Sequence, residues 1–176
     1  MSGTSTITVR PATRDDADVI AHIYNEGIRG RGATFETRER TPDDIARWFD
    51  DSRFPILVAE EFGQVVAWAA ASSYRERECY AGIAEYSVYV ATAHHGRGIG
   101  HVLMAPFLEA LERAGFWKVL SRLFPENAAS RALSARHGFR EVGTYRQHAQ
   151  LDGVWRDVLI VERLLRRAAR AGDEAR

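Results

Sequence analysis

The chain has 176 residues, a length typical of one domain with a sizeable hydrophobic core. Its 24 Lys and Arg residues balance 24 Asp and Glu residues, so no global positive field favours binding to nucleic acid or anionic lipid. A hydrophobic share of 45% and a charged share of 27% exclude a disordered composition. The single cysteine, Cys79, excludes a disulfide scaffold and a Cys-rich zinc site.

The sequence shows no internal repeat and no linker between two hydrophobic cores, so we expect one domain over residues 6–165. Residues 1–5 are expected to form a disordered N-terminus, and residues 166–176 an Arg- and Ala-rich tail that frays because nothing apolar anchors it. The chain shows no secretory signal, and no apolar stretch approaches the ~20 residues that span a bilayer. We therefore expect a cytoplasmic protein.

The first half of the chain predicts a half-buried strand, then two helices, then a meander of three strands. Thr13 with Asp16 forms a capping box, and Thr41 with Pro42 is the second helix start. The three strands are expected at residues 56–60, 64–72 and 83–90, the first two joined by a turn at Phe62-Gly63.

The second half predicts alternating helices and strands that end in a hairpin. A glycine-rich turn at residues 95–100 precedes a helical pattern that Gly115 stops. Pro106 lies inside this pattern and is expected to kink the helix while leaving its first turn intact. A strand at 117–124, a short helix capped by Asn127 and ended by Gly138, and strands at 142–151 and 154–161 follow. Asp152-Gly153 between the last two strands is a strong hairpin signal.

The order of strand, glycine-rich turn and helix indicates an anion site, because free backbone N–H groups and the positive end of the helix dipole meet there. Alone this signal is weak, since such a turn is often only structural. A dinucleotide-binding fold would need a βαβ unit, whereas this turn follows consecutive meander strands. A P-loop would need Lys followed by Ser or Thr after the last glycine, where His101-Val102 stands.

The turn and its surroundings resemble the GCN5-related N-acetyltransferase superfamily. The acyl-CoA signature of that superfamily, Arg/Gln-x-x-Gly-x-Gly/Ala after a long strand, is similar to His95-Gly96-Arg97-Gly98-Ile99-Gly100 after residues 85–90. Residues 125–130 and 138–139 extend the resemblance over nearly the whole domain. Residues 74–77, 85–90 and 152–158 look like the phosphinothricin and methionine sulfoximine acetyltransferases, and residues 25–28, 33–37 and 117–118 look closer to the arsinothricin-resistance branch.

The resemblance implies a single-domain α/β (α+β) fold with a mixed, mostly antiparallel sheet of about seven strands, flanking helices, and splayed fourth and fifth strands. It implies acetyl-CoA as co-substrate, with the pantetheine arm pairing in the gap as another strand would. Because backbone amides hold the phosphates, His95 in place of Arg or Gln is expected to weaken the site little. The cofactor-binding residues that it implies are Val88, Val90, His95, Gly96, Arg97, Gly98, Gly100, Asn127 and Ser130. No metal is expected, since the six histidines lack metal-ligand spacing.

Acetyl transfer to an amine requires a base, because the ammonium of an amino acid is largely protonated at neutral pH. Glu85 is the candidate, since alternation places it with Ser87 and Tyr89 on one face of a strand and partial burial would raise its pKa. Composition alone favours a solvent-facing carboxylate, whereas the resemblance favours the base. The donor to the departing thiolate is unassigned. Ser134, which stands where many phosphinothricin enzymes carry His, and Tyr145 are candidates.

Arg75 and Arg77 share a face of an extended segment and could hold two anionic groups by bidentate hydrogen bonds. Without the resemblance, the alternating charges around them are better explained as a solvated surface. With it, the two arginines form the substrate-anion pair, and Phe35, Thr37 and Tyr80 line the pocket.

The tryptophans and the cysteine are expected to be structural. Trp48, Trp68, Trp117 and Trp155 lie in amphipathic patterns and are interpreted as packing residues. Cys79 lies near the expected site without an adjacent base, and is interpreted as a small buried or half-buried residue.

These inferences favour an acetyl-CoA-dependent N-acetyltransferase that acts on the α-amino group of a small toxic amino-acid analogue of the arsinothricin, phosphinothricin or methionine sulfoximine type, conferring resistance. Two alternatives stay open, namely acetylation of a protein or peptide amine and a catalytically silent acyl-CoA-binding module with a regulatory role. Nucleic-acid binding through the Arg-rich tail has little support. The resemblance also implies a homodimer in which the last hairpin completes each site.

Overall fold

The computed structural model describes residues 6–165, and the expected terminal segments 1–5 and 166–176 lie outside the described residues. Within residues 6–165, seven strands form one sheet in the order β1-β2-β3-β4-β5-β7-β6. The strands are β1 (Ile7–Pro11), β2 (Ile56–Glu61), β3 (Gln64–Ser73), β4 (Ile83–Val90), β5 (Lys118–Leu123), β6 (Arg140–Leu151) and β7 (Val154–Leu164). The helices are α1 (Ala17–Arg29), α2 (Pro42–Ala46), α3 (Ile99–Arg113) and α4 (Ala128–Arg136). All neighbouring strands are antiparallel except β4 and β5, which confirms the expected mixed sheet.

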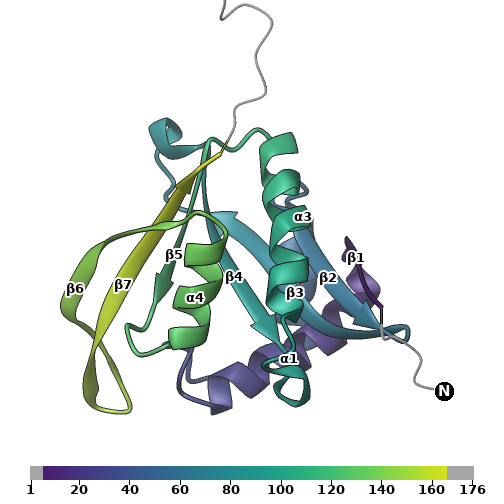
Figure 1. Cartoon of the computed structure of the whole chain (residues 1–176), viewed down its shortest axis with the longest axis horizontal. Coiled ribbons are helices and arrows are strands. Elements are labelled where there is room, and N and C mark those ends of the chain that lie inside the picture. The colour runs from purple at the N-terminus through teal and green to yellow at the C-terminus, as the bar shows by residue number, and fades with distance from the viewer. Residues whose placement is uncertain (1–5, 166–176) are drawn as a thin grey trace, which may run out of the picture.

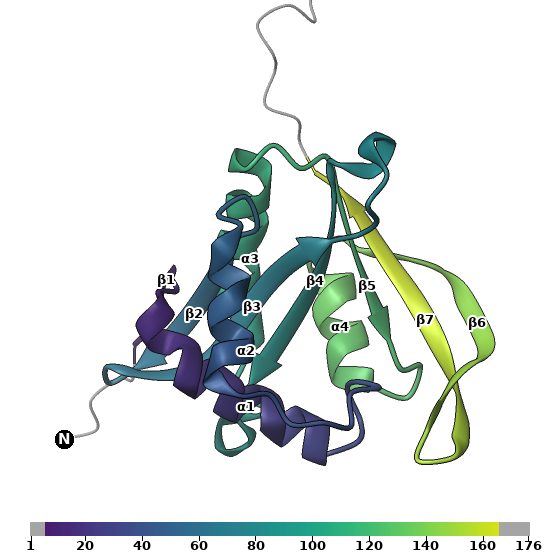
Figure 2. The same ribbon diagram turned by 180° about the vertical axis from the view of Figure 1, so that it is seen from behind.

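Helices cover both faces of the sheet. Figure 1 shows α3 and α4 on one face, and Figure 2 shows α1 and α2 on the other. The face under α3 has a buried cluster that includes Leu103, Phe107 and Tyr86. The face under α1 has a second cluster around Trp68, against which Tyr89 packs. Because Tyr86 and Tyr89 belong to opposite clusters, the alternation predicted for β4 is confirmed.

Local hydrogen bonds fix the helix starts that the sequence predicts. The carboxylate of Asp16 accepts the backbone N–H of Thr13 at 2.7 Å, in the capping box before the short helical turn that leads into α1. Asp44 accepts the N–H of Thr41 at 3.0 Å in the same arrangement at the start of α2. α3 runs across Pro106 without interruption, so its first turn is intact as expected.

The last two strands form the expected hairpin. Asp152 and Gly153 have φ angles of 50° and 80°, the left-handed values that a tight two-residue turn needs. β6 forms the outer edge of the sheet and is exposed over most of its length. Three packing predictions are wrong. Trp155, near the free edge, is 55% exposed, and Trp117, just before β5, is 37% exposed. Cys79 is exposed because it lies on the loop between β3 and β4.

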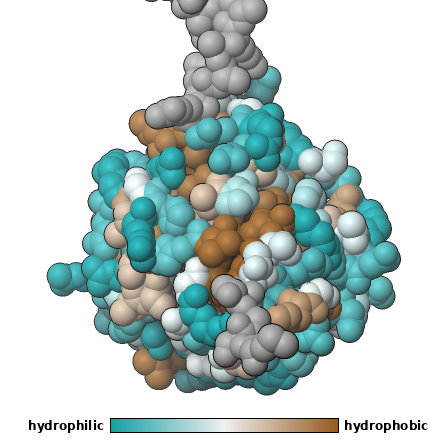
Figure 3. Space-filling view, turned by 45° about the vertical axis from the view of Figure 1, so that its right-hand side comes forward, coloured by the Kyte–Doolittle hydropathy of each residue, from teal (hydrophilic) through white to brown (hydrophobic). Residues whose placement is uncertain are grey.

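Most buried side chains are apolar, and most side chains on the surface are polar. Hydrophilic residues cover most of the face in Figure 3, and apolar ones gather there in separate patches. No helix within residues 6–165 has the length and apolar character needed to cross a membrane. Over the same residues, His, Cys, Asp and Glu side chains form no group of three or more that could hold a metal ion.

α1 lies close to β4 at Gly27, where there is little space for a side chain. A Cβ atom on Gly27 would lie 2.4 Å from Cε1 of Tyr89. Alanine is favoured over glycine in a helix by about 1 kcal/mol, but overpacking of this kind costs about 1–3 kcal/mol. We therefore expect Gly27→Ala to lower the free energy of unfolding, by up to about 2 kcal/mol, as measured by urea denaturation.

Gly143→Ala is the matched control. A Cβ atom on Gly143, which lies on the exposed strand β6, would meet no atom within 4 Å. We expect this variant to stay within about 0.5 kcal/mol of the wild type. A Gly27→Ala protein more stable than the wild type by about 1 kcal/mol would mean that the ring of Tyr89 moves aside without cost.

Candidate active site

The site lies where β4 and β5 part. The two parallel strands pair at three positions, the last of which is Glu85 with Leu120. Both strands keep their other neighbours, because β4 stays paired with β3 to its end and β5 stays paired with β7 to its end. Where the ladder stops, the hydroxyl of Ser121 donates to the carbonyl of Tyr86 at 3.0 Å. One edge of β4 therefore faces a gap, which confirms the expected splay.

Two cavities open into this gap. The larger has a volume of about 420 Å³ and is bounded by β4, β5, β6 and the loop between α1 and α2. The smaller, about 50 Å³, is lined by β4, β5 and α4. The polar lining of the larger cavity includes Tyr24, Thr34, Glu36, Glu85, Tyr89, Ser121, Arg122 and His148.

Glu85 extends from β4 into the lining of the larger cavity. Its side chain is 22% exposed, and its Oε2 atom lies 3.1 Å from Nη2 of Arg122 on β5. Burial raises the pKa of Glu85 above its ordinary value, and the opposing effect of the Arg122 charge is smaller. A half-buried carboxylate of this kind is suited to accept a proton from an amine near neutral pH.

The loop between α1 and α2 forms one wall of the larger cavity. Thr34, Phe35 and Glu36 all contribute to the lining. The ring of Phe35 packs edge-on against Phe124, with ring centroids 4.9 Å apart. Phe35 is thus where the sequence analysis expected it, whereas Thr37 is exposed and does not line the cavity.

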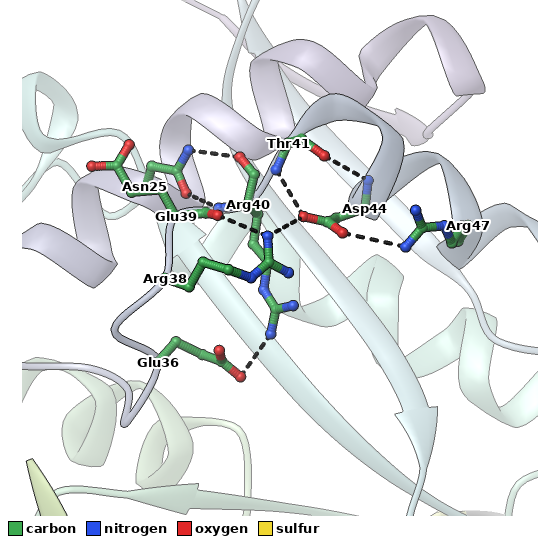
Figure 4. Close-up of polar contacts among 8 residues, drawn as sticks. All are labelled: Asn25, Glu36, Arg38, Glu39, Arg40, Thr41, Asp44 and Arg47. Carbon is green, nitrogen blue, oxygen red and sulfur yellow. Dashed lines mark hydrogen bonds and ion pairs between the residues drawn. The ribbon is translucent and has the colours of Figure 1, made fainter.

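Figure 4 shows how the far end of this loop is fastened to the two helices. The amide of Asn25 on α1 donates to the carbonyl of Arg40 at 2.9 Å and accepts its N–H at 2.7 Å. Arg40 in turn pairs with Glu36 at 2.7 Å. Arg38 donates to Asp44 of α2 at 2.9 Å. These contacts attach the loop that forms the cavity wall to α1 and α2.

The glycine turn leads into α3 as expected. Gly96 and Gly98 have φ angles of 74° and 76°, in the region that favours glycine, and Gly98 directly precedes the helix. The first N–H groups of a helix have no intrahelical partner and can bind an anion. A Cβ atom on Gly98 would meet nothing within 4 Å, so the turn is open on that side. These residues fit a diphosphate held by main-chain groups.

The side chains around the turn are engaged within the protein. The guanidinium of Arg97 makes two hydrogen bonds to the buried carboxylate of Glu61, one of them at 2.9 Å. Nε2 of His95 lies 2.8 Å from the carbonyl oxygen of Val90. The side chain of Arg97 is thus held in an ion pair, and the backbone of the turn, including that of Arg97, is left for an anion.

Three of the expected cofactor residues, Val88, Asn127 and Ser130, line the smaller cavity together. Oδ1 of Asn127 accepts the N–H of Ser130 at 3.0 Å and so caps α4. Nδ2 of Asn127 donates to the carbonyl of Gly32 at 3.3 Å. Asn127 thus joins the start of α4 to the loop wall.

Ser134 lies in the interior and lines neither cavity. Its hydroxyl donates to the carbonyl of Ser130 at 2.9 Å and lies 3.1 Å from the hydroxyl of Tyr86. Burial raises the pKa of Tyr86 to about 12, so this phenol is protonated and donates to Ser134. A hydroxyl that is 1% exposed and already engaged is poorly placed to donate to a departing sulfur. The structure gives Ser134 a packing role between α4 and β4.

Arg75 and Arg77 lie on the exposed loop between β3 and β4, outside the lining of both cavities. The guanidinium carbon of Arg75 is 5.2 Å from the ring centre of Tyr74, which packs edge-on against Tyr80. The phenols of Tyr74, Tyr80 and Tyr145 all raise the pKa of Arg75. The ring of Tyr145 on β6 itself stacks on the cavity residue His148, with ring centroids 4.8 Å apart.

Sequence reasoning missed several cavity residues. Arg122, the partner of Glu85, stands in a strand pattern that carries no functional signal by itself. His148 lies at an irregularity of β6 where the pairing with β7 shifts register. Tyr24 on α1 lines the cavity, and its ring also packs edge-on against Trp68.

Comparison with known proteins agrees with this geometry. The model of the acetyltransferase (GNAT) family matches residues 20–139. The chain belongs to this family. It is therefore an acyl-CoA N-acetyltransferase, and its GNAT fold is the one that the sequence resemblance implied.

Individual relatives refine the comparison. This GNAT chain is 35% identical over 171 residues to the phosphinothricin N-acetyltransferase of Streptomyces coelicolor, covering 94% of the chain and 100% of the relative. It is 32% identical over 162 residues to the L-methionine sulfoximine/L-methionine sulfone acetyltransferase of Pseudomonas aeruginosa, covering 88% and 92%. The structure is also similar to the crystal structure of a phosphinothricin acetyltransferase from Sinorhizobium meliloti in complex with AcCoA, with a TM-score of 0.85 and 29% sequence identity. The match covers 91% of this chain and 89% of the other.

The raised pKa of Glu85 predicts a pH dependence of stability. A carboxyl group whose pKa is higher in the folded than in the unfolded protein binds more protons when folded, so its ionisation costs stability. The contribution is fully present below the unfolded pKa of about 4.3 and is lost as pH rises through the folded pKa. We expect the free energy of unfolding of the wild type to fall relative to Glu85→Gln as pH rises above about 4.3 in urea titrations.

The same measurement can contradict this expectation. If the wild type gains stability relative to Glu85→Gln as pH rises, the attraction of Arg122 outweighs burial and the pKa of Glu85 is lowered.

Proposed function

We propose that this GNAT enzyme transfers the acetyl group of acetyl-CoA to the α-amino group of a small amino-acid analogue with a second anionic or tetrahedral group. Phosphinothricin and arsinothricin carry a second anionic group, and methionine sulfoximine carries a neutral tetrahedral one. The observation that carries the proposal is the position of Glu85, in the lining of the larger cavity where β4 and β5 part. The substrates named for the Streptomyces coelicolor and Pseudomonas aeruginosa relatives support the class. A role in resistance and a cytoplasmic location are predictions that accompany it.

Acetyl-CoA fits the residues that surround the gap. The free edge of β4 beyond Glu85 offers backbone groups to an extended arm, as a neighbouring strand would. Val88, Asn127 and Ser130 line that gap. The N–H groups that follow Gly98 at the start of α3 suit the diphosphate. When bound, acetyl-CoA supplies an activated thioester.

The amine must lose a proton before its nitrogen can attack. Glu85 accepts this proton directly or through a water, and its raised pKa brings it closer to the working pH. The nitrogen then bonds to the acetyl carbon and the carbon–sulfur bond breaks. The nitrogen loses a second proton to become an amide, and the thiolate that leaves takes one up. Backbone N–H groups on the free edge of β4 are available to the developing oxyanion.

Arg75 and Arg77 are proposed to bind the second anionic group of the substrate. They lie on the loop between β3 and β4, and the phenol of Tyr145, whose ring stacks on the cavity residue His148, raises the pKa of Arg75. Planar guanidinium groups bind phosphinate, arsonate or carboxylate oxygens in a bidentate manner. Phe35 supplies an apolar surface inside the cavity for the carbon chain between the two ends of the substrate.

The substrate class is tested by measuring thiol release from acetyl-CoA. The panel contains phosphinothricin, methionine sulfoximine, arsinothricin and a peptide with an N-terminal alanine. We expect turnover on at least one of the amino acids. Turnover on the peptide alone would contradict the substrate class and favour a protein or peptide N-acetyltransferase. Binding of acetyl-CoA without turnover on any amine would favour a silent acyl-CoA-binding module.

Replacing the proposed base separates chemistry from binding. We expect Glu85→Gln to lower kcat by ~10²–10⁴, the range for a lost general base, and to leave the Kd of acetyl-CoA unchanged in calorimetry. Glu109→Gln, on an exposed part of α3, is the control and should keep wild-type kcat. Wild-type turnover by Glu85→Gln would show that another group removes the proton.

We also propose that the enzyme is a homodimer formed through the β6–β7 hairpin. β6 is an edge strand, and Val142, Tyr145, Val154 and Trp155 around it are 47–61% exposed. An unpaired edge with apolar side chains is suited to a second copy of the chain. Light scattering should give twice the 19.8 kDa mass of one chain, and Trp155→Glu should shift it toward the monomer. A monomeric wild type at micromolar concentration would contradict the proposal.

A further inference from the structure

The cation inside the larger cavity is Arg122. Its side chain is 45% exposed, and the ion pair it makes joins its Nη2 atom to Oε2 of Glu85 at 3.1 Å. A guanidinium presents five N–H donors in a planar fork. One contact with a single carboxylate oxygen therefore leaves donors of Arg122 for a second acceptor in the cavity.

The other charged and titratable groups of the cavity come from several elements. Glu36 faces it from the loop wall and His148 from β6, and the phenols of Tyr24 and Tyr89 complete the set around the pair. Glu36 is itself paired with Arg40 at 2.7 Å. Among the described residues that line this cavity, Arg122 is the sole lysine or arginine. An anionic group that enters the cavity therefore has one permanently cationic side chain to bind.

The Glu85–Arg122 pair is complementary to a zwitterion. An α-amino acid carries an ammonium and a carboxylate on the same carbon, and the pair presents a carboxylate next to a guanidinium. An amino acid lying across it places its ammonium on Glu85 and its carboxylate on Arg122, so both charges keep a partner after leaving water. The N-terminus of a peptide or a simple amine has no free carboxylate next to its amine, and it leaves the donors of Arg122 unused.

We propose that Arg122 is a specificity-determining residue that binds the α-carboxylate of the substrate, so that the Glu85–Arg122 pair selects free α-amino acids. The inference rests on the proposed function and names the part of the substrate that enters the cavity. Arg75 and Arg77, on the loop between β3 and β4, are then left for the distal anionic group. Holding the carboxylate on β5 also turns the amino nitrogen toward β4, where Glu85 removes its proton.

The test compares phosphinothricin with its α-carboxamide, which keeps the amine and the phosphinate but lacks the α-carboxylate. We expect wild-type kcat/KM to favour the acid. Arg122→Met should lower the acid-to-carboxamide ratio of kcat/KM by about 10- to 100-fold, the range for a lost hydrogen bond to a charged group. Any effect of Arg122→Met through Glu85 falls on both substrates, because the same base serves both, and it cancels in the ratio.

Two further variants sharpen the result. Arg122→Lys keeps the charge without the planar fork and should give an intermediate ratio. Arg113→Met, at the exposed end of α3 and paired with Glu109, should leave the ratio at the wild-type value. An Arg122→Met protein that loses the same factor on both substrates would overturn the inference and restrict Arg122 to orienting Glu85.

The inference and the proposed function fail in different ways. If the wild type acetylates neither phosphinothricin nor the carboxamide, the proposed function fails, and calorimetric binding of the two compounds to the wild type and Arg122→Met then decides the inference. A preference for the acid that disappears in Arg122→Met supports it. Equal binding of acid and carboxamide by the wild type overturns it.

Discussion

The site depends on one constraint, which is that β4 and β5 stop pairing at Glu85 while each keeps its other neighbour. β4 remains bonded to β3 as far as Val90, and β5 remains bonded to β7 as far as Leu123. When β4 and β5 separate, only the hydrogen bonds between these two strands are lost. A buried backbone N–H or C=O group without a hydrogen-bond partner destabilises the fold. Here the carbonyl of Tyr86 accepts the hydroxyl of Ser121, and the remaining backbone groups along the gap face the two cavities.

The same register places the two charges of the cavity together. Glu85 lies opposite Leu120 in the last pair of the ladder, and alternation puts Arg122 on the same face as Leu120. A slip of one residue would send Arg122 to the other face, toward α3, and leave Glu85 without a cation. Burial would then raise the pKa of Glu85 without opposition. The pairing of β4 with β5 up to Glu85 thus sets the electrostatics of the proposed base.

The features that the sequence predicts correctly are those encoded within a few residues. The capping box of Thr13 and Asp16 closes within one helical turn, and Asp152-Gly153 specifies its hairpin by backbone preference alone. Features that depend on distant contacts have no local signal. Arg122 pairs with Glu85 only when β5 lies beside β4, and nothing near Arg122 in the sequence indicates this. The loop between α1 and α2 has no periodic pattern, so its sequence does not show that Thr34 lines the cavity and Thr37 does not.

The loop wall shows how weak contacts can define a pocket. Arg31, in the left-handed region with φ of 56°, pairs with Asp152 at the hairpin turn at 2.9 Å. Asn127 holds the neighbouring Gly32, and Asn25 holds the far end of the loop at Arg40. Each exposed contact alone contributes little.

Together these contacts tie the loop to the hairpin, α4 and α1, so its cavity side chains need little further ordering when a substrate binds. Because Asp152 belongs to the hairpin that we propose as the dimer contact, pairing of two chains would steady that hairpin and, through Arg31, the wall facing Glu85. Dimerisation would then affect substrate positioning through the ion pair between Arg31 and Asp152.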